Sequence, residues 1–150
     1  MKILFTIYFF LVTNIIAADY SSESIGKETY KFFIDTIGRY STEIRKTERT
    51  WTDSLGNYGL NICVGSIIKE KKKLNLALIC EYVDQEKQKN WSKLYRKKTI
   101  EDSVIGVVEY IEATDKYKFL VRKKCNYAVK LYDKSFFFLN INVMNKCYIN

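Results

Sequence analysis

The sequence predicts an α+β fold in which one N-terminal helix packs on an antiparallel meander sheet. Three observations predict it. Apolar residues recur with helical spacing early in the chain, strand-like runs separated by polar turns follow them, and four cysteines lie within or close to those later runs. At 150 residues the chain has room for a leader segment and a single disulfide-stabilised domain.

The first 18 residues have the features of a secretory signal peptide. Lys2 precedes an apolar run over Ile3–Ala17, and the small residues Ala17 and Ala18 precede Asp19. The run is shorter than the roughly 20 residues that a membrane-spanning helix needs. We therefore predict a cleaved signal peptide at 1–18 and a secreted, extracellular domain at 19–150, with no membrane span.

A helix is predicted at the start of that domain. Ser21, Ser22 and Ser24 offer N-cap oxygens. After them, apolar residues recur at three- and four-residue steps, which places them on one helical face: Tyr30, Phe33, Ile34, Ile37, Tyr40 and Ile44. We expect the helix to end near Arg45–Glu48, followed by a loop over Thr50–Gly59.

The first predicted hairpin carries the sharpest structural inference. Leu60–Ile68 and Leu74–Val83 are β-rich runs, and the charged segment Lys69–Lys73 separates them. A two-residue turn at Lys71–Lys72 would place Cys63 directly opposite Cys80. Residues directly opposite in an antiparallel pair are close enough for a disulfide, so the register predicts the Cys63–Cys80 bond.

Further strands are predicted at Val104–Glu112 and Tyr117–Lys123, followed by a last hairpin that turns at Asp133–Lys134. The arms of that hairpin are Tyr127–Tyr132 and Ser135–Val143. In the second arm Phe137, Leu139, Ile141 and Val143 alternate with Phe138, Asn140 and Asn142, the period of a strand with one buried face. Cys125 and Cys147 close the segment, but in this register the chain must bulge or leave the sheet after Val143 for them to bond.

The residue types exclude several classes of site. An even number of cysteines in a secreted chain predicts two disulfides. The chain has no histidine and no C-x-x-C pair, so we expect no metal site, no cofactor and none of the usual hydrolase triads. The carboxylate pairs Glu109 with Glu112 and Glu101 with Asp102 have no pocket assigned to them, so we expect no enzyme.

The surface features point to binding instead. The formal net charge of +8 suits an acidic protein, an acidic glycan or an anionic lipid. Nucleic acid is not expected, because the basic residues are spread along the chain and form no nucleic-acid-binding motif. Asn90-Trp91-Ser92 is an N-glycosylation sequon within the polar stretch Asp84–Lys93, which we expect to be a surface loop.

The stretch from Cys125 to Cys147 resembles the last two strands of the cystatin family, with one cysteine before the hairpin and one near the chain end. Ile37 and Tyr40 also resemble helix positions of that family. The resemblance implies a helix on an open sheet. Cystatins inhibit papain-like proteases through a Q-x-V-x-G loop and a proline-tryptophan loop, whereas the corresponding tips here are Lys69–Lys73 and Tyr132–Ser135. We therefore expect no working inhibitor of such proteases.

A second resemblance implies a different fold. Ala113–Val121, followed by Cys125, is similar to the T-D-x-Y motif of the lipocalins, which are eight-stranded barrels that hold small apolar ligands. Thr50-Trp51-Thr52 is the only counterpart of the family's G-x-W signature. This alternative implies a ligand cavity lined by Phe119, Val121, Phe137 and Leu139.

Two functions remain open at this point. The leading one is a secreted protein-binding module whose two hairpin tips form a cationic rim for an extracellular protein or acidic glycan. The residues expected at that rim are Lys69, Lys71, Lys72, Lys73, Asp133 and Lys134. The alternative is a lipocalin-like carrier of a small apolar ligand, and the volume of an internal cavity discriminates between the two.

Overall fold

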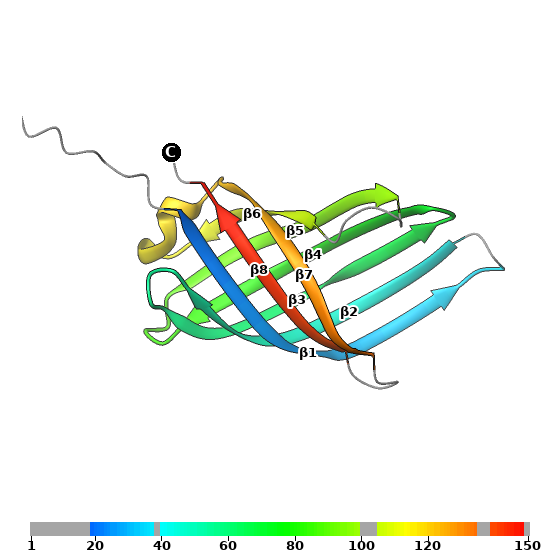
Figure 1. Ribbon diagram of the computed structural model, residues 1–150, viewed down its shortest axis with the longest axis horizontal. Coiled ribbons are helices and arrows are strands. Elements are labelled where there is room, and N and C mark those ends of the chain that lie inside the picture. Colours follow the sequence, from blue (N-terminus) through cyan, green and yellow to red (C-terminus); the bar gives the residue numbers. More distant parts are fainter. Residues whose placement is uncertain (1–18, 38–39, 100–104, 135–138, 149–150) are drawn as a thin grey trace, which may run out of the picture.

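A computed structural model describes residues 19–37, 40–99, 105–134 and 139–148, with the backbone alone at 97–99, 131–134 and 139–140. Eight antiparallel strands follow one another in chain order and close into a barrel (Figure 1). Their bounds are β1 Tyr20–Asp35, β2 Tyr40–Asp53, β3 Tyr58–Glu70, β4 Lys73–Asp84, β5 Lys89–Thr99, β6 Ile105–Ala113, β7 Lys124–Lys134 and β8 Leu139–Cys147, with a short 3₁₀ helix, η1, at Asp115–Leu120.

The predicted N-terminal helix is wrong, and with it the cystatin-like α+β fold. β1 and β2 occupy that segment as a long hairpin, in which Phe33 pairs with Glu43 and Ile34 pairs with Thr42. The three- and four-residue spacing had combined residues from both faces of these strands. All six residues of the predicted helical face are exposed. Aromatic and β-branched residues fit a strand better than a helix, and pairing with neighbours on both sides favours the sheet. The closed barrel fits the lipocalin-like alternative.

The β3–β4 hairpin confirms its predicted register. β3 ends at Glu70, β4 begins at Lys73, and Cys63 pairs with Cys80. Lys71 takes a positive φ of 51° in the two-residue turn between them, which is typical of turns whose twist matches the flanking strands. The predicted Cys63–Cys80 disulfide is present.

In the β7–β8 hairpin the predicted disulfide is correct and the predicted turn is wrong. β7 continues through Asp133 and Lys134, which pair with Asn140 and Leu139 of β8 and therefore do not form the turn. Tyr127 pairs with Asn145, a register that brings Cys125 and Cys147 together without any departure of β8 from the sheet. The Cys125–Cys147 disulfide is present.

Two other expectations about the middle of the chain are wrong. Most of the expected surface loop at Asp84–Lys93 belongs to β4 and β5, which meet at a short turn. The expected strand Tyr117–Lys123 is largely η1, so the T-D-x-Y-like stretch begins a helical turn rather than a strand. The predicted strand Val104–Glu112 is confirmed from Ile105 onward as β6, and Val104 lies outside the described residues.

The two ends of the barrel differ. We call the closed end the one that holds the first residues of β1, the β2–β3 and β4–β5 turns, η1 and the last residues of β8, which lie together in Figure 1. Trp51, Tyr82 and Tyr117 fill it, with edge-to-face ring contacts at 5.7 and 6.2 Å between centroids. We call the opposite end the open end, because β1 pairs with β8 only from Tyr20 to Lys27 and its remaining residues pair with β2 alone.

Within the described ranges, no helix is long and apolar enough to cross a membrane. The predicted signal peptide at 1–18 lies outside those ranges.

Candidate functional site

The barrel encloses a cavity of about 160 Å³. Side chains from six strands line it: Arg45, Thr47 and Arg49 on β2, Ile67 on β3, Leu76 and Leu78 on β4, Leu94 and Arg96 on β5, Tyr127 and Val129 on β7, and Ile141 and Val143 on β8. These positions follow the two-residue period that turns every second side chain of a strand inward. An eight-stranded barrel has an interior of about the right width for one small ligand.

The lining is mostly aliphatic, with polar groups at a few positions. Seven of the twelve lining residues are Leu, Ile or Val. The polar groups are three arginines, the Thr47 hydroxyl and the Tyr127 hydroxyl. An apolar wall with a few convergent polar groups is typical of small-molecule sites, in which the polar groups fix the orientation of the ligand.

Arg49 is the most unusual of these residues. It is 4% exposed, and its guanidinium contacts both sulfurs of the Cys63–Cys80 disulfide through Nη2. Its Nε has no hydrogen-bond partner, and no carboxylate in the described part of the chain pairs with it. Burial lowers the pKa of Arg49 from its ordinary value, and the nearby Tyr82 and Tyr127 only partly oppose that effect. An arginine nevertheless stays protonated in a protein, so a buried positive charge faces this cavity.

Two glycines make room for the polar side chains of the cavity. A Cβ on Gly26 would lie 2.6 Å from Cγ of Arg49, and a Cβ on Gly106 would lie 2.5 Å from the hydroxyl oxygen of Tyr127. Any other residue at these positions would displace the neighbouring strand or side chain. The strands β1 and β6 therefore carry glycine where Arg49 and Tyr127 need space.

Arg45, on the side of the cavity toward the open end, is paired with carboxylates. Glu43 accepts a hydrogen bond of 2.7 Å from Nζ of Lys69 and another from Arg45, and Arg45 also lies 3.2 Å from Glu28. Burial alone would raise the pKa of Glu43, but Lys69 and Arg45 outweigh it and lower that pKa. Arg45 is thus neutralised by carboxylates, in contrast to Arg49.

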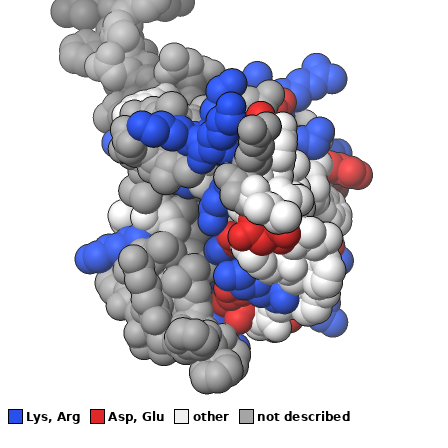
Figure 2. Space-filling view, turned by 90° about the vertical axis from the view of Figure 1, so that its right-hand side faces the viewer, with Lys and Arg blue, Asp and Glu red and all other residues white. Residues whose placement is uncertain are grey.

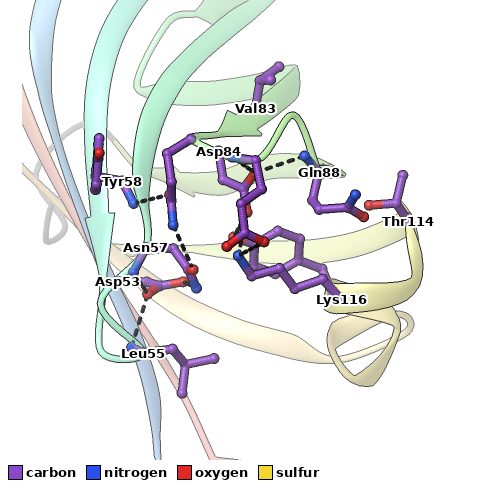
Figure 3. A network of polar contacts seen from close by, with 12 residues as sticks. Asp53, Leu55, Asn57, Tyr58, Val83, Asp84, Gln88, Thr114 and Lys116 are labelled. Carbon is purple, nitrogen blue, oxygen red and sulfur yellow. Dashed lines mark hydrogen bonds and ion pairs between the residues drawn. The ribbon is translucent and has the colours of Figure 1, made fainter.

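The closed end holds a polar network in which both carboxylate oxygens of Asp53 and of Asp84 have hydrogen-bond partners (Figure 3). Asp84 Oδ1 accepts from the backbone N–H groups of Glu86 and Gln88, both at 2.8 Å, and Oδ2 accepts from Lys116 Nζ at 2.8 Å and Tyr117 Oη at 2.9 Å. Burial raises the pKa of Asp84, but these hydrogen bonds outweigh it and hold the pKa below its ordinary value. The network connects the β4–β5 turn to η1.

The β2–β3 turn repeats the same arrangement. Asp53 Oδ1 accepts from the backbone N–H groups of Leu55 and Asn57, both at 2.9 Å. The two N–H donors follow Asp53 at the same spacing as the donors that follow Asp84. Each turn also has one residue with positive φ, Gly56 at 82° and Lys87 at 63°. Aspartates that bond to their own backbone fix tight turns, so this end is built for rigidity.

Five further buried polar atoms have no hydrogen-bond partner: Tyr82 Oη at the closed end, Ser24 Oγ, both side-chain polar atoms of Asn90, and Ser92 Oγ. Asn90 is 1% exposed and Ser92 is fully buried, both on β5. The surface-loop position expected for the sequon is therefore wrong. Glycosylation of Asn90 stays a prediction, and a buried side chain inside the barrel argues against it.

The residues predicted for a cationic rim are divided between two places. Lys71, Lys72 and Lys73 are exposed at the β3–β4 turn, at the end of the molecule where Figure 2 shows basic side chains gathered beside an uncharged patch. Lys69 instead pairs with the buried carboxylate of Glu43. Asp133 and Lys134 end β7, and their side chains lie outside the description. A role of this rim in binding stays a prediction.

The residues predicted to line a ligand cavity are not those that line it. Phe119 lies on η1, where its ring contacts Tyr20 at 5.8 Å between centroids, and Val121 follows η1 at the same closed end. Phe137 and the side chain of Leu139 lie outside the described residues. Glu109 and Glu112 lie on β6 opposite Lys93 and Trp91, and Glu101 and Asp102 are not described.

Arg49, Arg96 and Tyr127 were not predicted from the sequence as cavity residues. The sequence does carry a pattern that indicates the inward position of Arg49. Every second residue of β2 faces inward, at the period of a strand: Glu43, Arg45, Thr47, Arg49 and Trp51. Comparisons of this chain with protein-family models, with curated proteins and with solved structures give no match. A function therefore has to be inferred from the barrel and its cavity.

Proposed function

We propose that the protein is a secreted carrier that binds a small apolar ligand inside its barrel. The observation that supports this most directly is the cavity itself, which seven aliphatic side chains line from strands on different sides of the barrel. Cavities of about 150 Å³ in protein cores stay dry and bind small apolar molecules, so this one suits a ligand with a small apolar body. Two disulfides are typical of extracellular proteins and support the compartment.

The arrangement of the two ends also supports a carrier. Aromatic rings and the Asp84 network fill the closed end, so a ligand has its route at the open end, where β1 leaves β8. Two larger hollows, of about 510 and 370 Å³, lie against the outer faces of β2–β5 and β1–β3. Outward-facing side chains and strand glycines line these two hollows. Neither hollow is enclosed by strands on several sides, so neither resembles an internal ligand cavity.

The test is binding of an uncharged ligand, octan-1-ol, measured by isothermal titration calorimetry. We expect saturable binding of one molecule per chain, and we expect Val129→Trp to abolish it because the larger side chain would fill the cavity. Asn126→Trp is the matched control, since Asn126 is exposed on the same strand. Binding that survives Val129→Trp, or that Asn126→Trp removes equally, would contradict a site inside the barrel.

A second candidate function is recognition of an acidic extracellular protein or glycan by the β3–β4 turn. Lys71, Lys72 and Lys73 are consecutive, exposed and located at the open end. Binding by such a surface should weaken as the salt concentration rises, because salt screens exposed charges. The variant with Lys71→Glu and Lys73→Glu should lose retention on heparin-agarose while octan-1-ol binding is unchanged. Retention that is indifferent to both salt and the charge reversal would exclude this surface.

A further inference from the structure

A buried arginine without a counter-ion needs an explanation. Arg49 is 4% exposed, and the groups that its guanidinium contacts are disulfide sulfurs, which are weak acceptors without charge. Its Nε makes no hydrogen bond. Burying a charge without a partner costs several kcal/mol, so the bare barrel carries this residue at the expense of stability.

The surroundings of Arg49 are positive rather than neutral. Arg96 reaches the same cavity from β5, and both arginines act electrostatically on the Tyr127 hydroxyl that lies in the cavity wall. Among the described lining residues there is no Asp or Glu. Two acids on β1 and β2, Glu28 and Glu43, are engaged by Arg45 and Lys69. A cationic head group would be repelled here, and a neutral one would leave Arg49 uncompensated.

We propose that the ligand is a small carboxylate amphiphile, with its carboxylate on Arg49 and its apolar chain against the leucines, isoleucines and valines of the cavity. This inference rests on the carrier function proposed above. A carboxylate is the smallest organic anion that can pair with a guanidinium through parallel hydrogen bonds, and it fits a cavity of about 160 Å³ better than a phosphate with an apolar body would. The Tyr127 hydroxyl, which has no partner in the described structure, supplies a further donor.

The first arm of the test compares three ligands that share an eight-carbon chain: octanoate, octan-1-ol and octylamine. Calorimetric titration at neutral pH should show octanoate binding at least about tenfold more tightly than octan-1-ol, with octylamine weakest, since a charge-assisted hydrogen bond is roughly twice as strong as a neutral one. If octan-1-ol or octylamine binds as tightly as octanoate, the inference of a carboxylate ligand is wrong, while the proposed carrier function still holds. If none of the three binds, both the inference and the carrier function fail.

The second arm changes the protein. Arg49→Met should weaken octanoate by about 30-fold or more, the usual loss when one partner of a buried charge pair is truncated, and should leave octan-1-ol within about threefold. Arg122→Met is the matched control, because Arg122 is exposed after η1 at the closed end. It should change neither ligand.

Stability provides a readout that does not depend on any ligand. Without ligand, Arg49→Met should unfold at the same or a higher denaturant concentration than the wild type, because an apolar side chain of similar length replaces an unpaired buried charge. Added octanoate should raise the unfolding midpoint of the wild type and not of the variant. An Arg49→Met variant that is destabilised without ligand, or that binds octanoate as the wild type does, would show that Arg49 only supports the disulfide and would overturn the proposal.

Discussion

The closed end and the cavity bury polar groups in opposite ways. At the closed end, Asp84 accepts four hydrogen bonds and Lys116 lies between two carboxylates. At the cavity, Arg49 and Tyr127 each present a buried polar atom that makes no hydrogen bond, and so does Thr47. The two regions belong to one sheet and share β2, so the difference is not one of fold.

The difference separates polar groups that stabilise the protein from polar groups that are available to a ligand. A buried polar group contributes to stability only when its hydrogen bonds are made, and it costs free energy when they are not. A binding site needs buried polar groups whose hydrogen bonds are not made within the protein. A ligand that supplies the missing partner removes the free-energy cost of the unpaired group, and this gain contributes to its affinity. The closed end therefore supports the barrel, and the cavity is its candidate for function.

The largest expected effect is at the closed end. Asp84→Ala should lower the free energy of unfolding by about 3–5 kcal/mol, because Lys116 and Tyr117 would lose a buried anionic partner. Urea denaturation monitored by tryptophan fluorescence measures it. Glu86→Ala is the control, since Glu86 pairs with the same lysine but is 63% exposed in its side chain, and it should cost less than about 1 kcal/mol. Equal losses in the two variants would contradict the role given to Asp84.

A matched pair of tyrosines tests the comparison directly. Tyr117→Phe removes a hydroxyl that donates to Asp84 at 2.9 Å, and it should cost about 1.5–3 kcal/mol, as expected for a hydrogen bond to a charged group. Tyr127→Phe removes a hydroxyl that makes no hydrogen bond, so it should leave the stability of the unliganded protein unchanged or slightly higher. Denaturant midpoints compare the two. Similar losses at both positions would remove the distinction between the two regions.

The pH dependence of stability should come from the closed end as well. The folded-state pKa of Asp84 is lowered, so its contribution is fully present above the unfolded value of about 3.9 and is lost as the pH falls through the folded value. Stability should therefore decline below about pH 4, and Asp84→Asn should flatten this decline. Glu43, whose pKa is also lowered, remains in that variant, so the flattening should be partial. An unchanged acid profile in Asp84→Asn would assign the pH dependence to other carboxylates.

The sequence predicted the disulfides better than it predicted the fold. Two features were enough for Cys63–Cys80, a charged turn and two β-rich arms, because a two-residue hairpin fixes its register locally. The helix prediction failed because Tyr30, Phe33 and Ile34 lie in a part of β1 that pairs with β2 alone. No face of that hairpin is fully buried, so its apolar residues do not alternate as they do in β8.

The cavity could not be predicted from the sequence for a related reason. Its lining comes from six strands, and no local pattern shows that Arg49 on β2, Arg96 on β5 and Tyr127 on β7 converge. Barrel closure decides this, and closure depends on long-range pairing between β1 and β8. The T-D-x-Y-like stretch indicated a barrel, but its residues contribute to the closed end and not to the ligand site.

The smallest expected effect concerns the glycosylation sequon at Asn90. The motif is present in the sequence, but the structure buries the asparagine side chain. Asn90 is 1% exposed and points into the barrel between the cavity and the closed end, where a glycan has no space. Folded protein secreted from a eukaryotic host should therefore carry Asn90 unmodified, by peptide mass spectrometry. The control variant carries Lys71→Asn and Lys73→Thr, which create a sequon on the exposed turn, where asparagine tolerates the positive φ of 51°. That variant should gain one glycan with a change in stability below about 0.5 kcal/mol. A glycan on Asn90 of folded protein would mean that β5 does not turn this residue inward, and the lining of the cavity by Leu94 and Arg96 on the same strand would then be wrong as well.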